Sequence, residues 1–530
     1  MNKQSAKRRR EEDDDGSEIT IDRLSQLPQP ILHSILSLIP QKDAVRTSVL
    51  SKSWRYLWHG RFSVEFHDNL FAIKTEFWSF IDKTLQRYLD QNLSLQQFVV
   101  NIRSVVDFEI LQKWIPMVIM NMGVRSLNLI IYRITNFFPL PLVVFQSESL
   151  VELHLQHCNL NTLEFTDNVM LNNLQTLRLH EVCITDEIFE KILSSCPSIE
   201  NLDLVYCFFF KSIKLRKHRN IKNFSCVAFN KIIIEIEDPH ILESFRIEEC
   251  CSDWFLRHRN MHFPHLKSLN LDTVQLPETF DNFSSSFPCL NELILDSCHG
   301  LKEFRLLSSS IKRLTIKIDP MNPGKRIKAF IDTPNILYFE YSGHDLVPSI
   351  KFTTTSKEWK SQITLCYKLK HSDNDATSWF LKLNKLLKAL SQSHITLIFN
   401  PSKYKKLHIN DSYGGFYKPV VVEHLKLRGC YPSYFDPAIL NCFFWSFRPR
   451  YIQLDPGLAK CNLANYISKL ITGETGRYFW LQDLEEISTE VGNMDANEWN
   501  WVQTTSFPAL NSQQQIRYRL TWREQLSTFT

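Results

Sequence analysis

A leucine pattern that recurs through the middle of the chain constrains its fold more than any other feature. In LVELHLQHCNL (residues 150–160) the pattern has the form L-x-x-L-x-L-x-x-(N/C)-x-L. Copies of this frame, some of them looser, start at residues 124, 150, 174, 199, 221, 242, 266, 290, 311 and 336. Successive starts are 21 to 26 residues apart. A period this short favours a stacked array of similar units over one globular core.

The L-x-L part of each frame predicts a short strand, because alternate side chains of a strand point to the same side. Stacking such units buries their leucines against one another. The linking stretch from Thr185 to Ser198 predicts a helix, with Thr185 as the N-cap and Pro197 at the end. The frame resembles the leucine-rich repeat. The predicted fold class is α/β, a solenoid with parallel strands on the concave face and helices or loops on the convex face.

Several cysteines stand at the N/C position of the frame, eight residues after a frame start, including a later copy that starts at Val422: Cys158, Cys207, Cys250, Cys298 and Cys430. A small, weakly polar side chain suits a turn that faces backbone groups, so these cysteines are predicted to be structural. The alternative is a metal site at His154, His157 and Cys158. Their spacing supplies no fourth ligand for a tetrahedral ion, and no metal site is predicted. The odd total of 13 cysteines fits reduced thiols.

A second feature is an apolar segment near the start of the chain, residues 24–58. Ile31, Leu32, Ile35 and Leu36 recur at the three-to-four spacing of one helical face, and two further short amphipathic helices are predicted after Pro40. A piece of about 35 residues cannot stabilise a core alone. Its apolar side therefore needs a partner.

This segment resembles an F-box from Leu27 to Trp58, through L-P-x-x-I-L-x-x-I-L-x-x-I-P followed by K-D-A-V-R-T-S-x-L-S-K-x-W-R-x-L-W. The resemblance implies three helices that dock onto the Skp-type adaptor of a cullin–RING ubiquitin ligase and, through it, onto the cullin and RING subunits. The residues that it assigns to the adaptor interface are Leu27, Pro28, Ile31, Ile35, Leu36, Val45, Leu50, Trp54 and Leu57. One alternative is the core of an ordinary helical bundle. Another is a DNA-binding helix-turn-helix, for which Trp54, Leu57 and Trp58 are a poor base-reading set.

Taken together, the F-box segment and the repeats resemble plant F-box proteins with leucine-rich repeats. The stretch IDTPNILYFEYSG, Ile331 to Gly343, is also similar to that family, whereas the FBD module of many relatives finds no match in the pattern. The predicted domains are a disordered charged tail (1–20), the F-box (21–60), a linker or N-terminal cap of the solenoid (61–123), leucine-rich repeats (124–345), degenerate C-terminal repeats (346–460) and a C-terminal cap or tail (461–530).

Charge and apolar content limit the partners. The chain has 61 basic and 57 acidic residues, a balance that argues against a nucleic-acid-binding body. No apolar run approaches the roughly 18 residues of a membrane span. The charged start predicts an intracellular protein, in the nucleus and/or the cytoplasm. The run Lys7–Arg10 is either a nuclear import signal or, with Glu11–Asp15, part of a solvated tail.

The sequence predicts recognition rather than catalysis. It carries no phosphate-binding glycine motif and no catalytic signature, so neither an enzyme nor a cofactor is predicted. The residue four positions after each frame start is expected on the concave face, and the mixed charges of this column suit a protein substrate. The column contains the candidate substrate-binding residues His154, Arg178, Asp203, Arg246 and Asn270, with Ser225, Ile294, Thr315 and Glu340 between and beyond them.

The resulting prediction is a substrate-recognition subunit of an SCF-type ubiquitin ligase. Two alternatives of the binding class stay open, and a third is a hydrolase with a site that the sequence does not identify. One is a repeat scaffold whose F-box-like helices only cap the terminal coil, since a solenoid needs such caps. The other is a receptor of the same family that depends on a small molecule.

Overall fold

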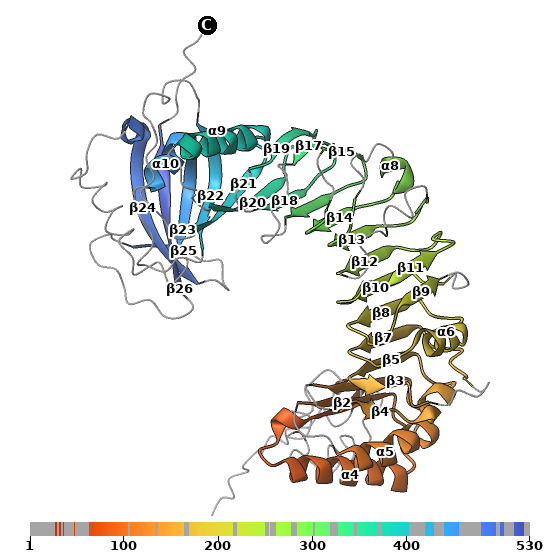
Figure 1. Ribbon diagram of the computed structural model, residues 1–530. Helices are drawn as coiled ribbons and strands as arrows, with labels where there is room; N and C mark the ends of the chain where they lie inside the picture. The colour runs from red at the N-terminus through yellow and green to blue at the C-terminus, as the bar shows by residue number, and fades with distance from the viewer. Residues whose placement is uncertain are drawn as a thin grey trace, which may run out of the picture. The chain divides into compact units, whose positions relative to one another are not determined.

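The computed structural model describes residues 27, 28, 31, 32, 35, 47, 254 and the ranges 63–103, 107–132, 136–163, 169–215, 220–249, 261–276, 283–299, 303–318, 327–343, 347–367, 374–401, 419–428, 439–454, 479–493, 499–502 and 514–523. The chain divides into two compact units, residues 1–157 and 158–530 (Figure 1). Each unit is described by itself below.

The first unit contains a parallel sheet of four strands, β1 (Ser63–His67), β2 (Gln97–Ile102), β3 (Ser126–Ile131) and β5 (Glu152–Gln156). Helix α4 (Lys74–Asp90) connects β1 to β2, and helix α5 (Phe108–Asn121) connects β2 to β3. The stretch predicted as a linker or cap, residues 61–123, therefore supplies two strands to the same sheet as the frame that starts at residue 124. The unit also holds η1 (Asp68–Leu70), β4 (Phe138–Pro139) and η2 (Leu142–Gln146).

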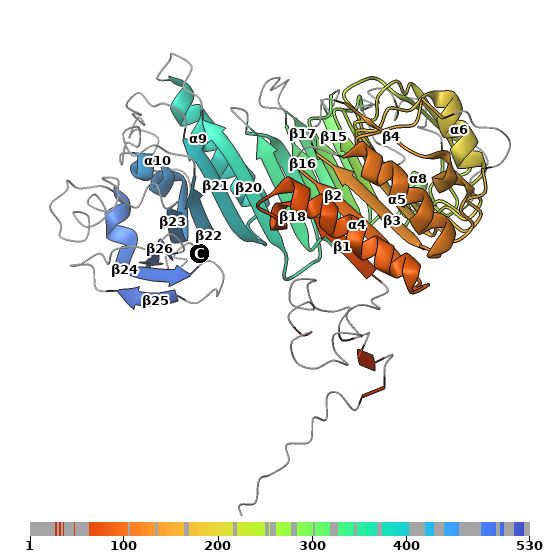
Figure 2. The same ribbon diagram turned by 90° about the horizontal axis from the view of Figure 1, so that it is seen from below.

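The two long helices of this unit lie side by side on one face of the sheet (Figure 2). Helix α4 buries an apolar stripe that includes Phe77, Ile81 and Leu85. Helix α5 begins after Asp107, whose carboxylate accepts a hydrogen bond from the Ile110 backbone N–H at 3.1 Å. Such a cap satisfies one of the backbone donors that a helix start leaves free. The helices are joined at Asp82, which accepts hydrogen bonds from Lys113 at 2.7 Å and from the Trp114 indole at 2.8 Å.

The second unit is dominated by one long parallel sheet. In it each strand pairs with the next in the order β7 (Thr176–His180), β8 (Asn201–Val205), β10 (Asn223–Val227), β12 (Ser244–Glu248), β13 (Ser268–Asp272), β14 (Glu292–Asp296), β16 (Arg313–Lys317), β18 (Tyr338–Gly343), β20 (Lys360–Tyr367), β21 (His394–Pro401), β22 (Val420–Leu427) and β23 (Phe447–Leu454). Across both units, every predicted frame from residue 124 to residue 336 holds a strand that begins two residues after the frame start. This confirms the α/β solenoid.

The core of the second unit consists of the leucines of the frame. On β13, Leu269 and Leu271 are fully buried, whereas Ser268, Asn270 and Asp272 on the other side are partly exposed. The same alternation recurs on β8 and β14. On these three strands the side chains between the buried leucines thus face solvent.

The opposite layer of this unit combines few helices with short strands. It holds α6 (Asp186–Ser194) and α8 (Phe283–Ser286), together with two parallel sheets made of β9 (Ser212–Leu215) and β11 (Ile233–Ile236), and of β15 (Glu303–Leu307), β17 (Lys328–Asp332) and β19 (Ser349–Thr353). In Figure 1 these elements follow the outer side of the curve of the second unit, and the long sheet follows its inner side. Strand β6 (Cys158–Asn159) precedes β7.

Helix α6 confirms the predicted helix after Thr185, with one correction. Thr185 is the N-cap residue, but its side chain makes no capping hydrogen bond. The neighbouring Asp186 carboxylate instead accepts hydrogen bonds from the backbone N–H groups of Lys211 and Ser212, at 2.7 and 3.2 Å. The first turn of α6 is therefore anchored to the start of β9 rather than closed on itself.

The parallel stacking ends in an antiparallel group of strands. Strand β26 (Gln514–Trp522) pairs antiparallel with β23, and β24 (Leu484–Asn493) pairs antiparallel with both β26 and β25 (Trp499–Val502). Helix α9 (Asn374–Ala389) contacts β19, β22 and helix α10 (Ile439–Ser446), and α10 contacts β23 and the short η6 (Phe479–Asp483). The strand direction thus alternates only after β23, at the end of the parallel sheet.

Candidate adaptor-docking segment and substrate surface

The described part of the predicted adaptor-docking segment consists of Leu27, Pro28, Ile31, Leu32, Ile35 and Thr47. The Pro28 carbonyl accepts hydrogen bonds from the backbone N–H groups of Ile31 and Leu32, at 2.9 and 3.2 Å, and Ile31 and Leu32 are helical. Leu32 is buried, whereas Ile31 is 47% exposed. Leu27 and Ile35 are partly exposed, and Pro28 is exposed. Five predicted interface residues lie outside the described residues: Leu36, Val45, Leu50, Trp54 and Leu57.

The predicted substrate column follows the strand register. In the first unit, His154 on β5 is opposite Asn128 on β3. In the second unit, one continuous row crosses five neighbouring strands through Arg178, Asp203, Ser225, Arg246 and Asn270. The row continues through Ile294, Thr315 and Glu340. The structure therefore brings together the four candidates of the second unit. Their role in binding stays a prediction.

The charges of this row are partly held by neighbours. The Asp203 carboxylate is 3.0 Å from His180 Nε2, on the adjacent strand. Burial opposes ionisation of Asp203, but hydrogen bonds from His180 and Ser225 and the charge of Arg178 outweigh it and lower the pKa of this carboxyl. Arg246 is 2.7 Å from Glu248. The row thus presents charged side chains of both signs, held in place by hydrogen bonds and ion pairs, rather than charges of one sign.

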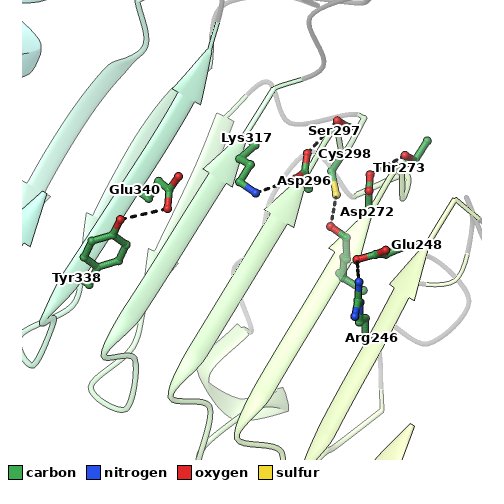
Figure 3. A network of polar contacts seen from close by, with 11 residues as sticks. Arg246, Glu248, Asp272, Thr273, Asp296, Ser297, Cys298, Lys317, Tyr338 and Glu340 are labelled. Atoms are coloured by element: carbon green, nitrogen blue, oxygen red, sulfur yellow. Dashed lines mark hydrogen bonds and ion pairs between the residues drawn. The ribbon is translucent and has the colours of Figure 1, made fainter. Parts of the chain in front are cut away.

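A second row, which the sequence reasoning missed, lies two residues further along the strands on the same side of the sheet. Glu248, Asp272 and Asp296 are the last residues of β12, β13 and β14, and Lys317 ends β16 (Figure 3). Lys317 is 3.2 Å from Asp296. The period of two along a strand would have identified this row, since positions four and six of each frame face the same way.

Asp272 is the unusual member of the second row. Its carboxylate accepts a hydrogen bond from the Thr273 hydroxyl at 2.7 Å. Among the residues that the structure describes, no lysine or arginine forms an ion pair with it. Burial raises the pKa of Asp272, and the negative charges of Asp296, Glu248 and Glu249 act in the same direction. This part of the sheet therefore carries a negative charge that Arg246 and Lys317 neutralise only in part.

The comparisons with known proteins agree with these features. The F-box domain family matches residues 24–62, and the family described as At1g61320/AtMIF1, LRR domain, matches residues 90–319. The putative F-box protein At1g49610 of Arabidopsis thaliana is 31% identical over 300 residues, which are 56% of this chain and 67% of that protein. The chain belongs to the F-box/LRR-repeat family. This confirms the resemblance on which the prediction rests.

Other relatives of this F-box/LRR-repeat protein are matched over shorter parts. The F-box/FBD/LRR-repeat protein At3g26920 of Arabidopsis thaliana is 38% identical over 188 residues, 34% of this chain and 41% of that protein. The F-box/LRR-repeat protein At5g02910 of the same plant is 27% identical over 272 residues, 50% of this chain and 51% of that protein. The chain thus spans about half or less of these two relatives. No solved structure matches.

An F-box implies, in general, binding to a Skp-type adaptor, and the two domains together support a general role in substrate recognition. The matching families indicate no enzyme. Among the described residues, no helix is long and apolar enough to cross a bilayer. Within the same residues, no group of three His, Cys, Asp or Glu side chains is placed to hold a metal ion.

The frame cysteines of this F-box/LRR-repeat protein take part in the turns after the strands. The Cys207 thiol donates to the Leu179 carbonyl and the Cys298 thiol to the Leu271 carbonyl, each at 3.3 Å. Burial raises the pKa of both thiols to about 12, and it also raises the pKa of Cys158. A thiol that stays protonated is a poor nucleophile and metal ligand, which supports a structural role. Cys250 and Cys430 lie outside the described residues.

The residue before the frame cysteine position adopts the left-handed conformation in several coils. Positive φ angles of 50 to 59° occur at His157, Glu181, Tyr206, Glu249, Thr273 and Ser297. This conformation is costly for residues other than glycine, so its recurrence shows that the packing of each coil imposes it. In these coils the turn redirects the chain after the strand, directly before the frame position that holds Cys158, Cys207 or Cys298 in three of them.

A cavity of about 580 Å³ lies at the antiparallel end of the second unit. Its wall contains four arginines and two acids, which are Arg448, Arg450, Arg519, Arg523, Glu423 and Asp483. Arg448 is 2.8 Å from Asp483, and Arg450 is 3.2 Å from Glu423. Small-molecule pockets are predominantly apolar, and this charged wall departs from that type. The residues come from segments far apart in the sequence, which is why no local motif predicted the cavity.

Proposed function

We propose that this chain is the substrate-recognition subunit of an SCF-type cullin–RING ubiquitin ligase. The observation that carries the proposal is the F-box match at residues 24–62, joined in one chain to repeats that present a register row of polar side chains. The F-box would dock the Skp-type adaptor and, through it, the cullin and RING subunits. The repeats would bind a protein substrate. We propose the nucleus and/or the cytoplasm as the place of action.

In this assembly the chain needs no catalytic group. It would hold the substrate near ubiquitin carried by the conjugating enzyme, and rate would come from raised effective concentration and from orientation of the target lysine. The side chains of Arg178, Asp203, Arg246 and Asn270 are the substrate contacts that we propose for the second unit, with His154 in the first. Few such residues usually dominate binding energy.

Replacing Leu27, Pro28 and Trp54 together by alanine is expected to lower capture of the purified chain by an immobilised Skp-type adaptor by about a hundredfold or more. Interface anchors commonly contribute about 2 kcal/mol each, and about 1.4 kcal/mol is a tenfold change in affinity. The measurement is a pull-down quantified over adaptor concentration.

The control is Leu337→Ala, which shortens an exposed apolar side chain in the second unit and should leave capture unchanged. Circular dichroism and urea unfolding of the repeats should be the same for all variants. Undiminished capture of the triple variant would favour the alternative of a repeat scaffold that has an F-box-like cap without ligase coupling.

A further inference from the structure

An aromatic cluster, the stacked pair Tyr206 and Phe229, lies at the carboxyl ends of β8 and β10. Phe209 and Phe229 are 67% and 73% exposed, and Phe208 is also exposed. The rings of Tyr206 and Phe229 stack with a centroid distance of 4.2 Å and an interplanar angle of 9°. By contrast, Phe210, which follows Phe209 in the chain, is buried, and the centre of its ring is 4.8 Å from that of Phe189. A stacked aromatic pair with one ring largely in solvent suits contact with a partner.

Acidic side chains continue this edge of the sheet. After β10 come β12, β13 and β14, which end in Glu248, Asp272 and Asp296 (Figure 3). The carboxyl ends of parallel strands meet at one edge, so the aromatic cluster and the acidic row are neighbours. The pKa of Tyr206 reflects this proximity. Burial raises the pKa of Tyr206, and the charges of Glu249, Glu248 and Asp272 raise it further.

The acidic row is only partly neutralised. Arg246 is 2.7 Å from Glu248, and Lys317 is 3.2 Å from Asp296. Asp272 and Glu249 have no ion pair with a lysine or arginine within the described ranges. Four acids and two bases leave a local charge of about −2 by this count. The whole chain has a formal net charge of +4, so the negative edge is a local feature and not a reflection of the overall composition.

We propose that this edge of the second unit docks a basic segment of the protein substrate, one in which arginine or lysine alternates with an apolar residue. The acidic row would pair with the cations, and the aromatic cluster would cover the apolar side chain or stack with a guanidinium. Partial burial of Asp272 strengthens its attraction for a cation, because the field there is less screened by water. This inference rests on the proposed function, since it names the chemistry of the substrate.

The test uses the full chain and two fluorescein-labelled peptides, one of alternating arginine and leucine and one of alternating glutamate and leucine. Fluorescence anisotropy should show binding of the arginine peptide and weak or no binding of the glutamate peptide. The double variant Asp272→Asn with Asp296→Asn should weaken binding of the arginine peptide by about tenfold, and Phe229→Ser by about fivefold. Raised salt should weaken binding in the wild-type chain more than in the double variant.

Matched controls are Glu358→Gln, an exposed acid elsewhere in the second unit, and Trp501→Ser, an exposed aromatic residue on β25. Neither should change binding of the arginine peptide. Asp272→Asn should fold normally, because its surroundings already disfavour the charged form. Equal affinity for the two peptides, or equal loss in the controls and in the edge variants, would overturn the inference.

Adaptor capture is measured on the same preparations. A chain that captures the adaptor but does not discriminate between the peptides would overturn the docking edge alone. A chain that discriminates between the peptides but does not capture the adaptor would contradict the proposed ligase function, and the edge would then serve a scaffold. The two failures are therefore distinguishable.

Discussion

Leu269→Ala is expected to lower the free energy of unfolding of the second unit by about 2–5 kcal/mol. Leu269 is fully buried on β13, in the middle of the long sheet, and pairs in register with Phe245 and Leu293. Truncating it removes buried apolar area and leaves a cavity that the stacked neighbours can fill only partly. Because each coil of a solenoid contacts only its neighbours, damage at this position weakens the interfaces on both sides.

Urea unfolding followed by circular dichroism measures this effect as a lower transition midpoint. The matched control is Asn270→Ala, the next residue on the same strand, whose side chain is on the solvent side. That change should stay within about 0.5 kcal/mol. Equal losses for the two substitutions would contradict the assignment of alternate residues to the core and the surface.

Asp483→Ala is expected to destabilise the antiparallel end of the second unit by about 3–5 kcal/mol. The side chains of Arg448 and Asp483 are only 10% and 25% exposed, and their charged atoms are 2.8 Å apart. Burial lowers the pKa of Arg448, and Asp483 opposes that shift. The guanidinium also lies 4.8 Å from the centre of the Trp522 ring. Removing the carboxylate leaves a buried cation without its partner, which costs far more than losing a surface ion pair.

The change should appear as an earlier step in thermal unfolding followed by tryptophan fluorescence, since Trp480 and Trp522 are close to each other in this region, with ring centroids 6.4 Å apart. Glu423→Ala is the control. It removes an acid from the same cavity wall, but its partner Arg450 is 59% exposed. The control should cost about 1 kcal/mol or less. An identical loss of unfolding free energy in both variants would show that burial of Arg448 does not determine the cost of removing its partner.

The repeats were predictable because their signal is periodic. Leucines such as Leu269 and Leu271 alternate on a strand and return at a fixed interval, so the frame alone indicated where each strand begins. Residues 63–123 carry the frame only in a degenerate form, Leu95, Phe98 and Val100, with no leucine at the two strand positions. Strand β2 is interrupted by the polar residues Gln97 and Asn101, and its place in the sheet depends on pairing with β1 and β3, about 30 residues away on either side. The strands β9 and β11 are too short to give a pattern of their own.

The site was predictable to the extent that it follows strand register. Arg178 and Asp203 were identified by counting from frame starts, and they are directly opposite each other. Asp272 was missed because the charge around it is set by residues on other strands. It depends on the ends of β12 and β14, which place Glu248 and Asp296 beside it, and on the absence of a basic partner among the described residues. The exposure of Phe229 likewise depends on how the coils stack, whereas its sequence context resembles that of a core residue.

Size-exclusion chromatography of the freshly purified full chain mixed with a Skp-type adaptor at micromolar concentration tests the central claim most directly. The account predicts one co-migrating complex that forms with the wild-type chain and not with the variant altered at Leu27, Pro28 and Trp54. Separate migration of the two proteins, with the F-box helices shown to be folded, would contradict it.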